Sequence, residues 1–126
     1  MHLPVGILLA IIGLGMLGFW IVHIRNGGLP DGLRSLESGG FIAFHIGAES
    51  LTGIACLVGG IALAMALPWG RVLALWACGM LLYTGINSLA WKEVRNRPAV
   101  SLMFIVPAVI AVLGIVYLVL ELLPVV

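Results

Sequence analysis

Apolar residues form four long runs along the chain, and short segments that carry most of the charge separate them. The runs are apolar on every face instead of alternating with period two, which predicts helices and argues against the strands of a membrane barrel. Each run approaches or exceeds the roughly 20 apolar residues that a transmembrane helix needs. We predict spans over about residues 3–23, 41–67, 72–91 and 99–121.

The connections between these runs are short. Pro68–Arg71 is expected to be a tight turn, and Lys92–Arg97 a basic turn. The longest connection, Arg25–Gly40, holds three leucines at helical spacing, so a short surface helix and a plain polar loop both remain open there. Short connections join antiparallel neighbours. The pattern therefore predicts an all-α, up-down, four-helix membrane bundle that occupies the whole chain, residues 1–126, as one domain.

Composition excludes a soluble domain. Of the 126 residues, 63% are hydrophobic and 9% are charged, and the mean hydropathy is +1.25. Soluble domains contain roughly 25% charged residues. A net charge of +1 also gives no reason to expect a nucleic-acid partner. We expect an integral protein of the lipid bilayer, in the plasma (inner) membrane of a prokaryote.

The basic residues predict the orientation. Lys and Arg concentrate in cytoplasmic loops. The first and third connections carry five of the six, whereas Arg71 lies in the second. We therefore expect the first and third connections in the cytoplasm and both termini on the other side. The five residues are Arg25, Arg34, Lys92, Arg95 and Arg97.

Ionisable residues within the spans are the main candidates for function. Placing a charge at the centre of a bilayer costs roughly 2.5–3.5 kcal/mol on insertion scales, so such residues usually face the bundle interior. Glu49 is the strongest case, and His45 lies four residues before it on the same helix face. Counting residues from the cytoplasmic ends places Glu49 level with Tyr83, and His45 level with Asn87. We take these four as the primary site, and His23, Thr52, Ser101 and Arg71 as secondary candidates.

Small residues predict where the helices pack, because glycine and alanine allow close approach of transmembrane helices. The two cysteines, Cys56 and Cys78, lie near mid-span without paired-thiol or zinc spacing, which favours a packing role. The expected contact faces are Gly13, Gly15 and Gly18 on the first span, and Cys56, Gly60 and Ala64 with Ala55 and Gly59 on the second.

The cluster carries no metal-site signature. His45 and Glu49 lie one helical turn apart, but no third residue has the spacing of a ligand. We therefore predict no metal site. Haem held by His23 and His45 stays open in principle, and the sequence names no cofactor.

The middle of the chain resembles the small DoxX-like membrane proteins. The resemblance covers spans two and three, about a third of the chain, and its motifs are simple. It rests on Glu49-x3-Gly53, on Gly59-Gly60, on Gly70-Arg71 with Leu73, Ala74 and Leu75 after it, and on Met80. The resemblance implies a four-helix bundle with Glu49 and Arg71 as matching positions. It also implies a subunit of a quinone-linked or redox membrane complex.

Three functions remain open for this cluster. In the first, the polar side chains satisfy one another between helices, and the protein is an accessory or structural subunit and not an enzyme. The small size and the lack of a soluble domain favour it. In the second, Glu49 carries protons in an oligomeric, proton-coupled small transporter. In the third, the protein is an intramembrane enzyme or a binder of a quinone or lipid, with His45 and Glu49 as an acid–base pair and Tyr83 and Asn87 orienting the ligand. We expect a homo-oligomer or a larger membrane complex.

Overall fold

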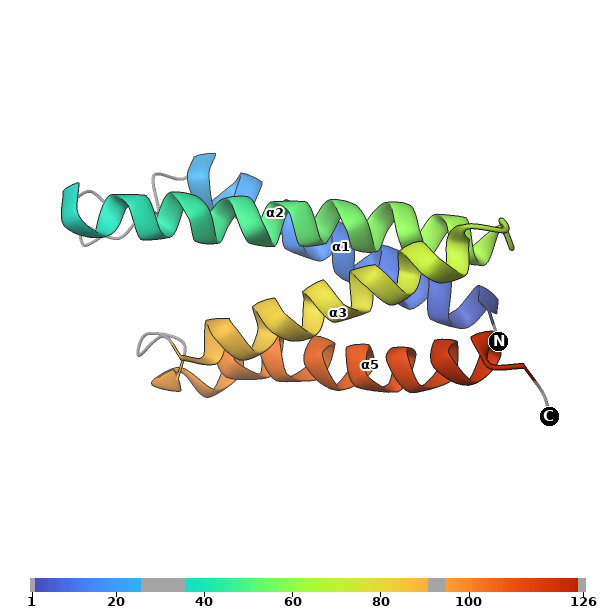
Figure 1. Cartoon of the computed structure of the whole chain (residues 1–126). Coiled ribbons are helices and arrows are strands. Elements are labelled where there is room, and N and C mark those ends of the chain that lie inside the picture. The colour runs from blue at the N-terminus through green and yellow to red at the C-terminus, as the bar shows by residue number, and fades with distance from the viewer. Residues whose placement is uncertain (1, 26–35, 91–94, 125–126) are drawn as a thin grey trace.

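The protein is all-α. The structure, a computed structural model, describes residues 2–25, 36–90 and 95–124. The side chains of His23 and of residues 36–43 lie outside the described part. The helices are α1 (His2–Arg25), α2 (Leu36–Ala64), α3 (Gly70–Leu89) and α5 (Pro98–Leu122) (Figure 1). All four are long and apolar enough to cross a membrane. The predicted helical class is therefore confirmed.

The second helix is longer than its apolar run. It begins at Leu36, within the connection for which a short surface helix and a plain polar loop were both left open, and it ends at Ala64 instead of 67. Leu29 and Leu33, two of the three leucines on which the choice between a surface helix and a plain loop rests, lie outside the described residues. The basic turn is described only from Arg95 onward.

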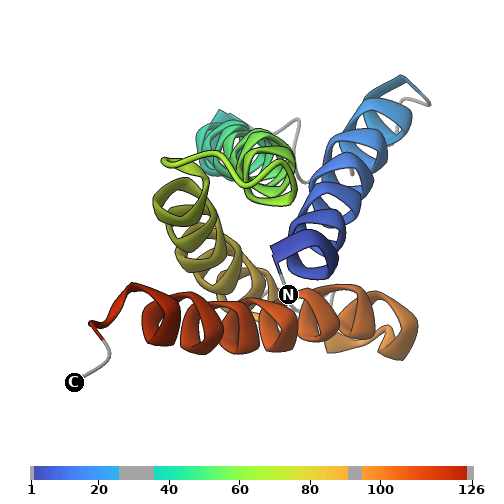
Figure 2. The same ribbon diagram turned by 90° about the vertical axis from the view of Figure 1, so that its right-hand side faces the viewer.

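The helices pack in chain order. α1 contacts α2, α2 contacts α3, and α3 contacts α5. Figure 1 shows both chain ends near the turn between α2 and α3, as an up-down arrangement requires. Figure 2 shows that the helices are inclined to one another, with α5 lying across the end of α1. There α1 and α5 meet through the rings of His2 and Tyr117, whose centroids are 5.9 Å apart. α1 and α5 therefore meet at the end of the bundle that holds the turn between α2 and α3.

Small side chains line the interior, and large apolar ones point outward. Trp76 and Tyr83 on α3 are 73% and 69% exposed. Helices in a membrane gain little from burying large apolar groups against each other, because lipid is equally apolar, and they pack through small residues instead. The cysteines fit this pattern, since both are fully buried and the Cys56 thiol lies 3.8 Å from the Ala77 carbonyl oxygen. The buried positions of α3 are Gly70, Ala74, Ala77, Cys78, Leu81, Thr84, Gly85 and Ser88.

Glycines bring the α1 and α2 backbones together. A Cβ atom at Gly6 would stand 2.5 Å from the Gly60 carbonyl oxygen, and one at Gly60 would stand 2.5 Å from the Gly6 oxygen. A Cβ atom at Gly13 would stand 2.5 Å from the Gly53 carbonyl oxygen, and one at Gly53 would stand 3.3 Å from the Gly13 oxygen. Gly15 and Gly18 have no neighbouring atom within 4 Å of a built Cβ, so the expected contact role is wrong at these two positions.

The end of α2 is fixed by a Schellman motif. The Leu67 N–H donates to the Ala62 carbonyl, and the Ala66 N–H donates to the Leu63 carbonyl, each at 3.0 Å. Ala66 has a φ of 55°, the left-handed conformation in which glycine is usual. Pro68 follows and prevents the helix from continuing. These local features explain why the helix stops before 67.

Replacing Ala66 by glycine is expected to stabilise the protein by about 1 kcal/mol. The left-handed conformation costs a residue with a Cβ atom roughly 1–2 kcal/mol, and glycine removes most of this cost. The greater freedom of glycine in the unfolded chain offsets part of the gain. Reversible unfolding by SDS in mixed micelles measures the difference. A lower free energy of unfolding for Ala66→Gly would contradict the assignment of backbone strain at this turn.

Candidate functional site

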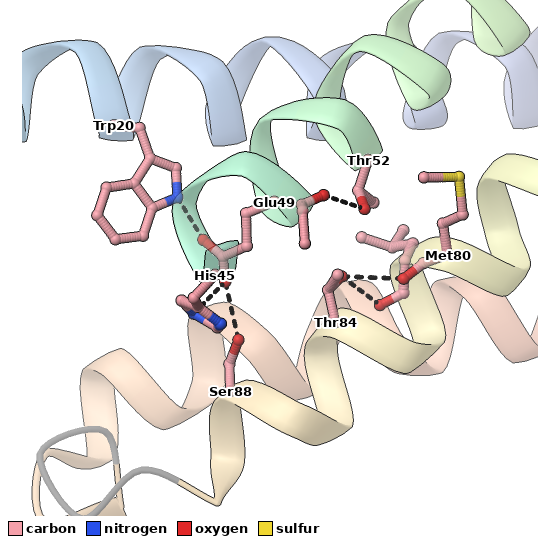
Figure 3. Close-up of polar contacts among 9 residues, drawn as sticks. Trp20, His45, Glu49, Thr52, Met80, Thr84 and Ser88 are labelled. Atoms are coloured by element: carbon pink, nitrogen blue, oxygen red, sulfur yellow. Dashed lines mark hydrogen bonds and ion pairs between the residues drawn. The ribbon is translucent and has the colours of Figure 1, made fainter. Parts of the chain in front are cut away.

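A buried carboxylate joins three helices. Glu49 on α2 is 2% exposed. The indole N–H of Trp20 on α1 donates to its Oε2, and the Ser88 hydroxyl on α3 donates to its Oε1 at 2.8 Å (Figure 3). His45, one turn earlier on α2, places Nε2 3.2 Å from the same Oε1. We call these four residues the Glu49 cluster.

His45 forms the edge of the cluster. Its side chain is 14% exposed, against 3% for that of Glu49. The Trp20 ring stands edge-on to the imidazole, with centroids 6.3 Å apart and an interplanar angle of 81°. His45 donates to the carboxylate when Nε2 carries a proton. Trp20 thus covers His45 as well as bonding to Glu49.

The hydroxyl groups near this cluster are satisfied within their own helices. Thr52 donates to the Ala48 carbonyl oxygen at 2.8 Å, and Thr84 donates to the Met80 oxygen at 3.0 Å (Figure 3). Within the described part of the chain, no buried side-chain nitrogen or oxygen lacks a hydrogen-bond partner. An unsatisfied buried polar group costs about 1–3 kcal/mol. At this depth of the bundle, the buried polar side chains that the structure describes therefore all have hydrogen-bond partners within the protein.

The structure does not bring Tyr83 and Asn87 to this cluster. Both side chains are exposed on the outer face of α3, so the expectation that they face Glu49 is wrong. The residues one position later, Thr84 and Ser88, point inward instead. Successive helical residues differ by about 100° around the axis, so one position separates the two faces. Whether Tyr83 and Asn87 bind a ligand stays a prediction.

The secondary candidates have separate positions. Thr52 is buried and bonded to its own helix. Ser101 lies in the first turn of α5, where its N–H donates to the Arg97 carbonyl oxygen. The side chain of His23 lies outside the described part. Arg71 lies at the other end of the bundle.

Sequence reasoning missed Trp20 and Ser88. Trp20 was not among the predicted site residues, yet its indole N–H donates to Glu49. Ser88 follows Thr84 by one helical turn, and both belong to the row of small residues on α3. That row is the signal that could have found Ser88, because small residues mark the packed face of a transmembrane helix.

Tyr83 lines a groove on the outer surface between α2 and α3. The groove has a volume of about 430 Å³, and its walls include Thr52, Thr84, Trp76 and Gly79. No atom lies within 4 Å of a Cβ built at Gly79. Two exposed aromatic rings therefore flank an open stretch of α3. Glu49 is not among the residues that line the groove.

A second polar group lies at the end of the bundle where the termini meet. His2 Nε2 is 3.3 Å from an Arg71 guanidinium nitrogen, and His2 Nδ1 is 3.1 Å from the Tyr117 hydroxyl oxygen. The Glu121 carboxylate is 3.7 Å from His2 Nε2. We call these residues, which come from α1, α3 and α5, the Arg71 cluster.

Ser88→Ala is expected to lower the free energy of unfolding by about 1 kcal/mol. The change removes one hydrogen bond to a buried carboxylate, and interhelical hydrogen bonds in membrane proteins average about 0.6 kcal/mol and reach about 1.7. Asn87→Ala is the matched control, since it truncates the adjacent, exposed residue and should change stability by less than about 0.5 kcal/mol. SDS unfolding measures both variants. Equal effects would contradict the inward orientation of Ser88.

The comparison with protein families matches residues 3–124 to a domain of unknown function, DUF8058. The chain belongs to the DUF8058 family. The match covers all four helices almost completely. Curated proteins and solved structures give no match. Among the described residues, no group of three or more His, Cys, Asp or Glu side chains is arranged to hold a metal ion.

Proposed function

We propose that this DUF8058 protein is an integral membrane protein that acts as an accessory or structural subunit of a larger membrane assembly. The Glu49 cluster holds α1, α2 and α3 in one arrangement, and the outer surface of the bundle contacts lipid and partner helices. The observation that carries the proposal is the Glu49 carboxylate, whose donors from α1 and α3 are all internal.

The hydrogen bonds of the Glu49 carboxylate support a structural role over a transport role. A carboxylate that carries protons through a membrane must exchange its hydrogen-bond partners with water or substrate during each cycle. Both oxygens of Glu49 already have protein partners, and the Glu49 side chain is 3% exposed. The proposal therefore assigns Glu49 to assembly of the helices.

The outer surface supports a role in an assembly. In the windows that could span a membrane, only 17% of residues are buried for α1 and for α5. Large apolar side chains cover these two helices, which leaves room for lipid and for neighbouring helices. The distribution of Lys and Arg supports cytoplasmic first and third connections. The resemblance of residues 49–80 to DoxX-like proteins supports membership in a redox membrane complex.

Native mass spectrometry of the protein, extracted gently from its own membrane, tests the proposal. We expect one copy in a complex with a larger membrane protein. A homo-oligomer that carries a reproducible small-molecule mass would contradict the accessory role. That result would favour the alternative functions, proton-coupled transport or chemistry on a hydrophobic ligand.

A liposome assay with a pH-sensitive dye separates the alternatives. If the protein is a structural subunit, wild type and Glu49→Gln give the same proton movement as empty liposomes. Proton flux that requires Glu49, in a variant that assembles normally, would identify a transporter. Ile54→Ala is the control, because Ile54 is exposed on the same helix and its loss leaves the Glu49 cluster intact.

The groove between α2 and α3 favours a hydrophobic ligand as the second candidate function. Trp76 and Tyr83 flank the groove, and Thr84 adds a polar wall. Within the described residues the Tyr83 hydroxyl has no hydrogen-bond partner, so it is available to a quinone or lipid carbonyl. Loss of a co-purified lipid or quinone in Tyr83→Phe, with retention in Asn87→Ala, would support this function.

A further inference from the structure

We infer that the Arg71 cluster binds the headgroup of a zwitterionic, amine-bearing phospholipid, with the phosphate on Arg71 and the ammonium group near Glu121. The inference rests on the proposed membrane insertion, and it adds a specific lipid site at the end of the bundle opposite the Glu49 cluster. The cavity, the available hydrogen-bond donors and the arrangement of charges carry it.

A cavity adjoins the cluster. It has a volume of about 300 Å³, and its lining includes His2 and Arg71 together with Leu63, Leu67 and Leu122. Apolar walls beside a guanidinium group suit an amphiphile, because the acyl chain contacts the leucines while the headgroup meets the charge. The turn between α2 and α3 and the end of α5 form the rim, where a bilayer would place its headgroups.

The Arg71 guanidinium group has N–H donors that no described residue uses. A guanidinium group carries five N–H donors in a planar fork that matches the oxygens of a phosphate. Within residues 2–25, 36–90 and 95–124, the one hydrogen bond of the Arg71 side chain is to His2. Arg71 is also the one described basic residue at this end of the bundle, since Arg25, Arg95 and Arg97 belong to the other end.

The hydrogen bonds of His2 fix its role. Arginine has no lone pair to offer, so His2 Nε2 accepts from Arg71, and Nδ1 then carries the proton and donates to the Tyr117 oxygen. In this form the imidazole is neutral and has no proton left for Glu121. His2 therefore orients Arg71 between α1 and α5 without neutralising the nearby carboxylate.

Glu121 decides the class of headgroup. Its carboxylate lies 3.7 Å from the same imidazole nitrogen that contacts Arg71, so a guanidinium group and a carboxylate both approach His2, which lines the cavity. A purely anionic headgroup would gain from Arg71 but be repelled by Glu121. A phosphate followed by a primary amine meets both charges. The pair thus selects a phosphoethanolamine headgroup over a phosphoglycerol one.

Lipid binding in native mass spectrometry tests the inference on the detergent-solubilised protein. The probes are phosphatidylethanolamine, phosphatidylglycerol and diacylglycerol with identical chains. Wild type should bind phosphatidylethanolamine at least about tenfold more tightly than diacylglycerol, which corresponds to one charge-assisted contact. Arg71→Gln should abolish this preference, and Arg95→Gln, at the opposite end, should leave it unchanged. Glu121→Gln should weaken phosphatidylethanolamine binding and strengthen phosphatidylglycerol binding.

A cavity-filling variant and a competition with inorganic phosphate complete the test. Leu122→Trp fills the cavity and leaves every charge in place, so it should remove lipid binding even if Arg71→Gln does not fold. Inorganic phosphate should not displace the lipid, and displacement at millimolar concentration would mean that the site serves free phosphate instead. Equal binding of phosphatidylethanolamine by wild type, Arg71→Gln and Leu122→Trp would overturn the inference. The partner analysis by native mass spectrometry stays an independent test of the proposed function.

Discussion

Replacing Glu49 by alanine is expected to lower the free energy of unfolding by about 2–4 kcal/mol. The substitution removes the acceptor for donors on two other helices, Trp20 on α1 and Ser88 on α3. Stranding a buried donor costs about 1–3 kcal/mol, and breaking a buried charged interaction costs more. The average interhelical hydrogen bond in a membrane is weaker, about 0.6 kcal/mol, because partly unfolded helices also find partners. The three contacts of Glu49 nonetheless add to a large effect.

The loss of Glu49 should affect its two hydrogen-bond donors, Ser88 and Trp20, unequally. The Ser88 hydroxyl can rotate and donate to the carbonyl oxygen one turn earlier in α3, as Thr84 already does with Met80. The Trp20 indole has no such alternative, since its N–H points away from its own helix (Figure 3). The loss should therefore fall mainly on the contact between α1 and α2. A Glu49→Ala, Trp20→Phe double variant should be less destabilised than the two single changes predict together.

Reversible SDS unfolding in mixed micelles measures these free energies. Ile54→Ala is the matched control on α2, because Ile54 is 49% exposed and loses a comparable volume. Glu49→Gln should fall between wild type and Glu49→Ala, since the amide keeps one acceptor oxygen and the same shape. If Glu49→Ala and Ile54→Ala unfold at the same free energy, the carboxylate contributes nothing to assembly. Its burial would then have to be explained by transport or catalysis.

The sequence predicts the four helices because their apolar runs are long and uninterrupted. The same feature hides which side of each helix faces its neighbours. A soluble helix shows its buried side as an apolar stripe. Here both sides of α3 are apolar, and the difference is one of size, with Ala74 and Cys78 inside and Trp76 outside. Residue size predicts that Thr84, and not Tyr83, lies on the inward face of α3.

The depth of the polar residues could be estimated, whereas their direction could not. Counting residues from the helix ends set Glu49 level with Tyr83, about one and a half turns from its α3 partner, Ser88. That estimate needs only the rise per residue. Rotation about the axis depends on packing between helices, which no local pattern encodes. Trp20 shows the same limit, because an aromatic residue near a helix end serves equally well at the membrane interface and as a donor to a buried carboxylate.

The contact between α1 and α2 should be highly sensitive to added volume. A Cβ atom at Gly60 would stand 2.5 Å from the Gly6 oxygen and 2.6 Å from the Ala10 nitrogen, both backbone atoms. Backbone atoms of a packed helix cannot rotate out of the way, so the two helices must separate. Gly60→Ala is therefore expected to lower the free energy of unfolding by about 2–3 kcal/mol, the range of overpacked cores.

Gly15→Ala is the control on the same pair of helices. No atom lies within 4 Å of a Cβ at Gly15, so its stability should change by less than about 0.5 kcal/mol. Gly6→Ala should resemble Gly60→Ala, because each residue would strike the carbonyl oxygen of the other. Once one substitution has pushed the helices apart, the second meets less resistance. The double variant should therefore lose clearly less than the sum of the two single effects. Strict additivity in SDS unfolding would mean that the two glycines do not share one contact.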